Sequence, residues 1–156
     1  MTKANLEFVY TTYIRTTPEK VWQAITAPEF ARQYWVNENI SDWKKGSEWK
    51  HVAGKEIKIG GKIVESNPPK RLVMTWASPS NPSDESQVAI DISMVEGLVR
   101  LDVVHTKLSD EMGRGVSVGW PLVLSSMKSF LETGKGIDIM AIKKCGSEET
   151  VKTTGR

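Results

Sequence analysis

Residues 116–134 carry the one long helical pattern of this chain, and this pattern constrains the fold more than any other feature. Large apolar side chains recur there at spacings of three and four residues: Trp120, Val123, Leu124, Met127 and Leu131. Phe130 widens this stripe, and the opposite side is expected to be solvated through Ser125, Ser126, Lys128 and Ser129. Gly134 is expected to end the helix in the left-handed conformation. Such a helix is roughly 25 Å long at 1.5 Å per residue, about the width of five strands. We therefore expect it to pack across a β-sheet.

Length and composition describe an ordinary globular chain. Its 156 residues suit a single domain, and 39% are hydrophobic while 26% are charged. The formal net charge is +2, with acids and bases interleaved, which argues against a nucleic-acid-binding groove. No apolar run approaches the length of a membrane span, and the N-terminus lacks the pattern of a secretory signal. With Cys145 as its one cysteine, the chain is predicted to be cytoplasmic.

The remaining pattern is that of a meander. A strand is predicted at 6–15, followed by a short helix after Thr17-Pro18 and a second short helix after Pro28. Further strands are predicted at 36–43, 47–52, 57–65, 72–77, 87–94 and 98–106. Residues 78–85 are interpreted as a polar loop, and Gly60-Gly61 as a bulge or a close backbone approach. We expect one domain over residues 1–142 and a polar, flexible tail over 143–156.

Four motifs in this order resemble a known family. Thr17-Pro18-Glu19-Lys20-Val21-Trp22 is followed by Ala27-Pro28-Glu29, and then by Trp35 with the segment 41–47. Gly61, Glu65, Pro68-Pro69 and Arg71-Leu72 form the third motif, and Gly119-Trp120 with Leu131-Glu132-Thr133-Gly134 forms the fourth. Over roughly residues 6–135 the chain is similar to the branch of the START and birch-pollen-allergen (SRPBCC) superfamily named after the C-terminal domain of the activator of the heat-shock-protein-90 ATPase.

The resemblance implies an α+β helix-grip fold. In that fold a curved antiparallel sheet of about seven strands wraps around a long C-terminal helix, with two short helices after the first strand. Stand-alone domains of this branch are associated with holding hydrophobic small molecules. The eukaryotic co-chaperone carries a further N-terminal domain, which we do not expect here because the first predicted strand starts within ten residues of Met1. Fold alone does not determine activity, so binding and stress-related chaperone roles are expectations by analogy.

Strand alternation identifies the side chains that face the predicted helix. One row contains Val88, Ile90, Ile92 and Met94, and the next contains Val99, Leu101, Val103 and His105. We predict a ligand cavity between sheet and helix, lined by Trp49, Trp76, Ile90, Ile92, Leu101, Val103, His105, Trp120, Leu124 and Met127. The alternative is that these residues simply fill a solid core.

His105 has two interpretations because a buried histidine needs partners for its ring nitrogens. It either bonds to a backbone carbonyl or an indole, or it anchors a polar group of a ligand. No cofactor or metal is predicted: the chain has two histidines, His51 and His105, and no carboxylate at ligand spacing. Nucleophilic catalysis has no candidate, because Cys145 lies in the tail and no serine occupies a strained elbow.

Three functions follow from these observations. The first is non-enzymatic binding of an apolar or aromatic, lipid-like small molecule. The second is a co-chaperone-like interaction with heat-shock protein 90, for which the basic residues Lys44, Lys45 and Lys50 are a modest indication. The third is a small enzyme of the cyclase or hydratase kind, which would need a titratable pair such as His105 with His51 or Tyr34.

Overall fold

The computed structural model describes residues 3–35 and 37–139, and its element order confirms the predicted α+β helix-grip class. The elements, in chain order, are β1 (Leu6–Ile14), α1 (Pro18–Thr26), α2 (Pro28–Tyr34), β2 (Glu38–Ser41), β3 (Glu48–Ala53), β4 (Glu56–Asn67), β5 (Arg71–Ser78), β6 (Asn81–Val95), β7 (Leu98–Leu108) and α3 (Asp110–Thr133). The predicted tail over 143–156 and Cys145 lie outside the described residues.

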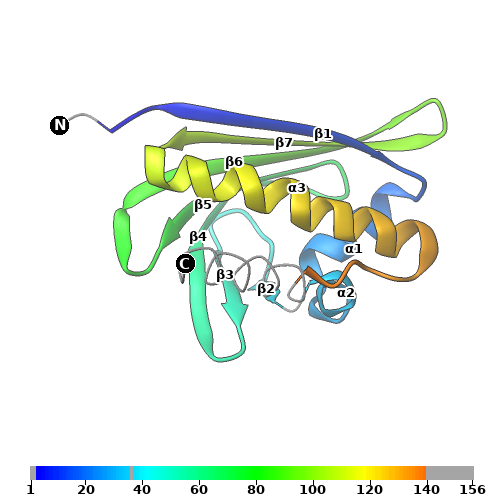
Figure 1. Ribbon diagram of the computed structural model, residues 1–156, viewed down its shortest axis with the longest axis horizontal. Coiled ribbons are helices and arrows are strands. Elements are labelled where there is room, and N and C mark those ends of the chain that lie inside the picture. The colour runs from blue at the N-terminus through cyan, green and yellow to red at the C-terminus, as the bar shows by residue number, and fades with distance from the viewer. Residues whose placement is uncertain (1–2, 36, 140–156) are drawn as a thin grey trace, which may run out of the picture.

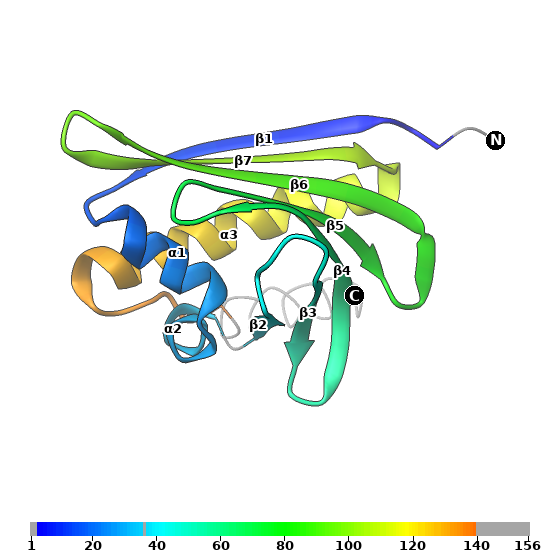
Figure 2. The ribbon, with the colours of Figure 1, turned by 180° about the vertical axis from the view of Figure 1, so that it is seen from behind.

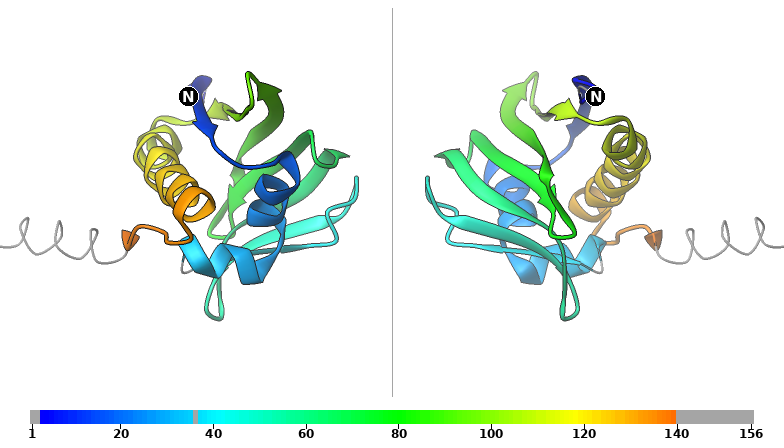
Figure 3. Two further views of the ribbon diagram at one scale, coloured as in Figure 1. Left: turned by 90° about the vertical axis from the view of Figure 1, so that its right-hand side faces the viewer. Right: turned by 90° about the vertical axis from the view of Figure 1, so that its left-hand side faces the viewer.

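The seven strands form one antiparallel sheet in the order β1-β7-β6-β5-β4-β3-β2. Every neighbouring pair except β1 and β7 is consecutive in sequence, as short turns between strands predict. The helix α3 runs along one face of the sheet, with α1 and α2 at one end of it (Figures 1 and 2). The end-on views show the strands curving around α3 (Figure 3). The helix therefore buries its apolar stripe on the concave face of the sheet.

The helix boundaries follow from local capping. Thr17 caps α1 by accepting a hydrogen bond from the backbone N–H of Lys20, and Pro28 begins α2 immediately afterwards. The helix α3 ends as predicted at Gly134, whose φ is 85°. It begins six residues earlier than the apolar pattern indicated, because Ser109 caps it through the N–H of Met112. Glycines at 113 and 115 interrupt the hydrophobic period there, and this hid the first turns.

The interpretation of residues 78–85 as a polar loop is wrong. β5 ends at Ser78 and β6 begins at Asn81, so that only Pro79 and Ser80 form the turn. The register is irregular between the pairs Trp76–Ser86 and Ser78–Asn81, and Pro82 lies in this irregular part of the hairpin. A proline is tolerated there because a regular ladder does not need its missing N–H. The hairpin consequently extends one side of the sheet beyond the hydrophobic core.

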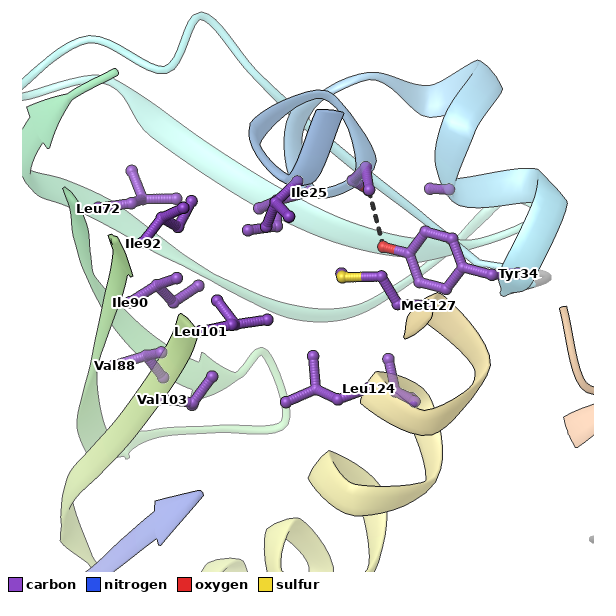
Figure 4. Close-up of a cluster of buried hydrophobic side chains, with 14 of the residues drawn as sticks. Ile25, Tyr34, Leu72, Val88, Ile90, Ile92, Leu101, Val103, Leu124 and Met127 are labelled. Atoms are coloured by element: carbon purple, nitrogen blue, oxygen red, sulfur yellow. Dashed lines mark hydrogen bonds between the residues drawn. The ribbon is translucent and has the colours of Figure 1, made fainter. Parts of the chain in front are cut away.

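The core lies between the sheet and the second half of α3. The buried rows of β6 and β7 meet Leu124 and Met127, and the Tyr34 hydroxyl donates a hydrogen bond to the Ala24 carbonyl at 2.7 Å (Figure 4). Two predictions of side-chain burial are wrong. Met94, next to the last residue of β6, is 52% exposed, although its cross-strand partner Val99 is buried. Ser126, expected on the solvated side, is fully buried because the chain after Gly134 folds back over it.

Candidate ligand cleft

A cleft of about 420 Å³ opens between the first half of α3 and the strands β4, β5 and β6. Its apolar lining consists of Trp35, Ile59, Trp76, Met112, Val116, Trp120 and Val123. Its polar lining consists of Lys58, Ser78, Ser80, Asn81, Asp84 and Glu111, of which the middle four belong to the β5–β6 hairpin. A site of this volume, with an apolar floor and a few polar groups, is typical of small-molecule binding.

The space predicted to be the cavity is nearly filled. A void of about 30 Å³ remains between the sheet and the second half of α3. This is about a tenth of the roughly 300 Å³ at the lower end of small-molecule sites. Bulky side chains from both sides, including Trp49 and Met127, close the interior. The open volume therefore lies beside the core and not inside it.

The predicted site residues separate into three groups. Trp76 and Trp120 line the cleft, together with Trp35 and Val123, and these four also border the inner void. Six others border only the void: Trp49, Ile90, Leu101, Val103, Leu124 and Met127. Ile92 and His105 line neither space, although both are buried. The three shared indoles, Trp35, Trp76 and Trp120, thus form the wall between the core and the cleft.

Two glycines of α3 give the cleft its room. Met112, Gly115, Val116, Gly119, Trp120 and Val123 share one helix face and line the cleft. A Cβ atom built on Gly115 or Gly119 would meet no atom within 4 Å, so neither glycine serves a close backbone approach. Glycine in a helix interior costs about 0.8–1.0 kcal/mol relative to alanine. Packing does not explain these two glycines, whereas an open cleft does.

His105 is held by a directed chain of hydrogen bonds. The Trp120 Nε1–H donates to His105 Nδ1 at 3.0 Å, so Nδ1 is the acceptor and the neutral ring carries its proton on Nε2. His105 Nε2 donates this proton to Ser86 Oγ, with 2.7 Å between the two heavy atoms, and the Ser86 hydroxyl donates in turn to the Trp76 carbonyl at 3.1 Å. Burial lowers the pKa of His105 to about 4, and the charge of Lys3 adds to this. Both nitrogens are therefore engaged within the protein, one of them with an indole.

His51 carries the opposite tautomer. The Asn39 amide donates to the Ile25 carbonyl at 3.1 Å, which leaves its Oδ1 to accept from His51 Nδ1 at 2.9 Å. Nε2 then accepts from the Asn37 amide at 3.2 Å. Trp35 lies against the ring, with centroids 4.2 Å apart, and burial lowers the pKa of His51 to about 4. His51 thus supports the Trp35 wall of the cleft and does not line the cleft itself.

The Trp76 ring is the centre of an aromatic cluster. Its centroid lies 5.3 Å from that of Trp49, 5.2 Å from that of His105 and 5.5 Å from that of Trp120. Its Nε1 is buried and has no hydrogen-bond partner among the described residues. By contrast, the Trp49 Nε1–H donates to the Thr75 carbonyl at 2.7 Å. Rings held on several sides in this way make a rigid wall.

Asp84 fastens the two sides of the cleft together. Its carboxylate accepts a hydrogen bond from Ser109 Oγ at 2.6 Å and forms an ion pair with Lys3 Nζ at 2.9 Å. Both contacts lower the pKa of Asp84. Because Ser109 caps α3 and Asp84 belongs to β6, this contact sets the position of the helix start against the hairpin. The sequence analysis missed Asp84, which fell in the predicted loop, although Ser109 before two acids is a recognisable capping signal.

Among the described residues, no group of three or more His, Cys, Asp or Glu side chains is placed to hold a metal ion. No helix in this part of the chain is long and apolar enough to cross a membrane. The ionisable side chains that line the cleft are Lys58, Asp84 and Glu111. The site therefore offers aromatic surface, hydroxyl and amide groups, and a small number of charges.

Comparison with known proteins agrees with this architecture. The family model described as "Activator of Hsp90 ATPase homolog 1-like protein" matches residues 15–132. No curated protein sequence matches the chain. Among solved structures, CalU16 from Micromonospora echinospora is 22% identical with a TM-score of 0.70, covering 83% of this chain and 78% of that one.

Two further structures show the same fold. The Aha1 dimer from Colwellia psychrerythraea is 23% identical with a TM-score of 0.70, and covers 84% of this chain and 99% of that one. PFC0360w, an HSP90 activator from Plasmodium falciparum, is 22% identical with a TM-score of 0.62, and covers 73% and 86%. At these identities the likeness concerns the fold and not the activity.

Proposed function

The chain belongs to the Activator of Hsp90 ATPase homolog 1-like family, and within this family we propose that it is a non-enzymatic binder of apolar or aromatic small molecules. The proposed site is the cleft between α3 and the β5–β6 hairpin, with Trp35, Trp76 and Trp120 as its walls. This differs in place from the interior cavity expected from the sequence, and it keeps the chemical class of ligand.

One observation carries the proposal, namely that the cleft is kept open by two glycines that lower the stability of α3. Gly115 and Gly119 weaken α3, and no packing contact compensates for this loss. Proteins commonly give up stability where function needs it. Here the compensating gain is about 420 Å³ of space beside three indoles, where burial of apolar ligand surface contributes roughly 25 cal/mol per Å² before binding costs are subtracted.

The arrangement of titratable groups favours binding over catalysis. The pair considered for an enzyme, His105 with His51 or Tyr34, has all of its polar atoms engaged in internal hydrogen bonds. Burial also raises the pKa of Tyr34 and lowers that of both histidines, so each side chain stays neutral at neutral pH. None of the three lines the cleft.

The second candidate function is a chaperone contact, which the family description favours. Lys44, Lys45 and Lys50 are exposed around β3, where they are available to an acidic partner. This candidate does not use the cleft, so the two functions can be separated by a variant that fills it.

The test is a titration of the protein with flavone and with a fatty acid, followed by NMR amide shifts. We expect the shifts to concentrate on residues that line the cleft, such as Gly119 and Trp120. In Gly119→Leu the new side chain points into open cleft space and should abolish binding while the fold is retained. The matched control is Val118→Leu, one residue earlier, where the side chain is 67% exposed. Unchanged binding by Gly119→Leu would contradict the proposed site.

A further inference from the structure

We propose that the cleft prefers organic cations, in particular aromatic or alkyl ligands that bear an ammonium group. This inference rests on the proposed function and narrows it to a ligand class. It follows from two independent properties of the lining, the aromatic surface and the balance of charge.

The aromatic property is the presence of Trp35, Trp76 and Trp120 in one cleft. Indole is the side chain that attracts a cation most strongly to its ring face, and several rings around one space recognise ammonium ligands. Trp76 and Trp120 lie 5.5 Å apart between centroids and are inclined by 45°, so the two rings form an angled wall. Trp35 contributes a third ring from the end of α2.

The second property is the charge balance at the cleft, where one carboxylate has no positively charged partner among the described residues. Lys58 is neutralised by Glu56, with Nζ and Oε2 3.0 Å apart, and Asp84 is neutralised by Lys3. Glu111 also lines the cleft, and within residues 3–35 and 37–139 no ion pair involves it. Among the described residues, the lining thus holds one negative charge, that of Glu111, without a counter-ion. A cationic ligand would provide this counter-ion.

Neutral polar groups are compatible with this preference. Ser78, Ser80 and Asn81 line the hairpin side of the cleft, and each has an oxygen atom that can face a positive charge. For a carboxylate ligand, by contrast, Lys58 is the one positively charged side chain among the described residues of the lining, and it is already paired. Fatty acids should therefore bind more weakly than ammonium compounds of similar apolar area.

The experiment compares three probes of nearly equal shape on the full chain. These are (3-hydroxyphenyl)trimethylammonium, the neutral 3-tert-butylphenol and the anionic 3-hydroxybenzenesulfonate. We expect the cation to bind about fivefold more tightly than the neutral probe, although the neutral probe is the more hydrophobic of the two. The anion should bind most weakly. Affinities are measured by NMR titration at about 0.15 M salt, where charges more than about 8 Å away are largely screened.

A matched pair of variants tests the role of Glu111. Glu111→Gln removes the unpaired charge, and Asp110→Asn removes the neighbouring charge, which is exposed and does not line the cleft. Both residues lie in the first turn of α3, so both variants lose the same favourable interaction with the helix dipole. Because Glu111 is also exposed, we expect Glu111→Gln to weaken binding of the cation about twofold to fivefold, with the neutral probe unchanged. Asp110→Asn should leave both unchanged.

The outcomes separate the two proposals. Equal affinity for the cation and the neutral probe, or equal effects of the two variants, overturns the preference for cations and leaves the binding function in place. Failure of all three probes and of flavone to bind in the cleft overturns the binding function itself.

Discussion

The two histidines show how single residues are specified by their neighbours. His105 is protonated on Nε2 because the Trp120 indole occupies Nδ1, and His51 is protonated on Nδ1 because Asn39 accepts there. In both rings a second proton would face a donor, Trp120 Nε1–H in one case and the Asn37 amide in the other. Protonation therefore breaks a hydrogen bond as well as burying a charge. The result is two aromatic supports for the cleft walls that stay neutral at physiological pH.

This predicts a dependence of stability on pH. The pKa of each histidine falls from 6.5 to about 4 on folding, because burial disfavours the charged form. Between these two pH values the unfolded chain binds more protons than the folded chain. The contribution of each histidine to the free energy of unfolding is therefore complete above pH 6.5 and decreases as the pH drops towards 4. We expect a loss of about 2 kcal/mol per histidine between pH 7 and pH 5, measured by urea unfolding. An imidazole NMR signal that titrates near pH 6.5 in the folded protein would contradict this.

A second prediction concerns two adjacent serines of α3. Ser126 Oγ accepts from the Ile137 N–H at 2.9 Å and lies 2.7 Å from the Tyr34 carbonyl, and it is fully buried. Ser126→Ala leaves these buried groups without a partner and should cost about 1–3 kcal/mol. Ser125 is exposed and bonds only to the Pro121 carbonyl of its own helix, so Ser125→Ala should change stability by less than about 0.5 kcal/mol. Equal melting temperatures for the two variants would refute this assignment.

At the scale of elements, α3 consists of two unlike halves. The first half contains Gly113, Gly115, Gly119 and Pro121, which lower helix propensity and remove one backbone donor. The second half buries Val123, Leu124 and Met127 against the sheet. The ends of the helix are fixed by Ser109 and Gly134, while tertiary packing stabilises only its second half strongly. The first half of α3, which lines the cleft, is therefore the half with small side chains and few packing contacts.

Replacing a cleft glycine by alanine should therefore stabilise the protein. Gly119→Ala adds a methyl group that meets nothing and improves helix propensity, so we expect a gain of about 0.5–1 kcal/mol in the free energy of unfolding. The comparison is Gly113→Ala, whose Cβ would lie 3.3 Å from Leu6 Cδ1, so the gain should be smaller. Thermal unfolding measures both. A destabilised Gly119→Ala would mean that the cleft is already filled.

The opposite result is expected for a glycine of the sheet. A Cβ on Gly61 would collide with the carbonyl oxygen of Thr75 on the neighbouring strand β5. The Thr75 Oγ1 hydroxyl also accepts a hydrogen bond from the Lys62 N–H, so the two strands cannot move apart without losing that bond. We expect Gly61→Ala to cost about 1–3 kcal/mol through forced backbone shifts, measured by urea unfolding with Gly119→Ala as the reference.

At the scale of the whole molecule, the sheet and helix enclose a core in which a void of about 30 Å³ remains. The aromatic wall of Trp76 and Trp120 divides this core from the lateral cleft. The Asp84 contact with Ser109 then holds the hairpin and the helix start at a fixed separation. Stability and binding are therefore located in different parts of the same fold.

The final prediction separates the binder from the co-chaperone. A helix-grip unit that acts alone lacks the gain of about 10²–10⁴ in affinity that linked modules provide. We expect negligible stimulation of a heat-shock-protein-90 ATPase by this chain at micromolar concentration. A several-fold stimulation that persists in Gly119→Leu would favour the chaperone function over small-molecule binding.

The order of the elements could be predicted from sequence because each depends on local signals. Thr17-Pro18, Pro28, Gly134 and the alternation of β6 and β7 act through neighbouring residues, and all appear in the structure as expected except for Met94 near the end of β6. The family motifs agree with the same order. The start of α3 was missed where Gly113 and Gly115 break the hydrophobic period, and the hairpin was missed where polar residues continue a strand past the core.

The position of the candidate site depended on tertiary structure. A periodic pattern shows that Met127 and Leu101 face inwards, but it does not show whether opposing side chains meet. Here they meet and leave about 30 Å³, whereas Gly119, which the apolar period does not include, borders the larger space. Likewise, the bond of His105 to an indole requires residues 15 positions apart to be brought within 3.0 Å. The sequence by itself determined the elements and their buried faces, because these follow from local periodicity. Which faces close into a core and which stay apart was decided by packing volume, a property of distant residues together.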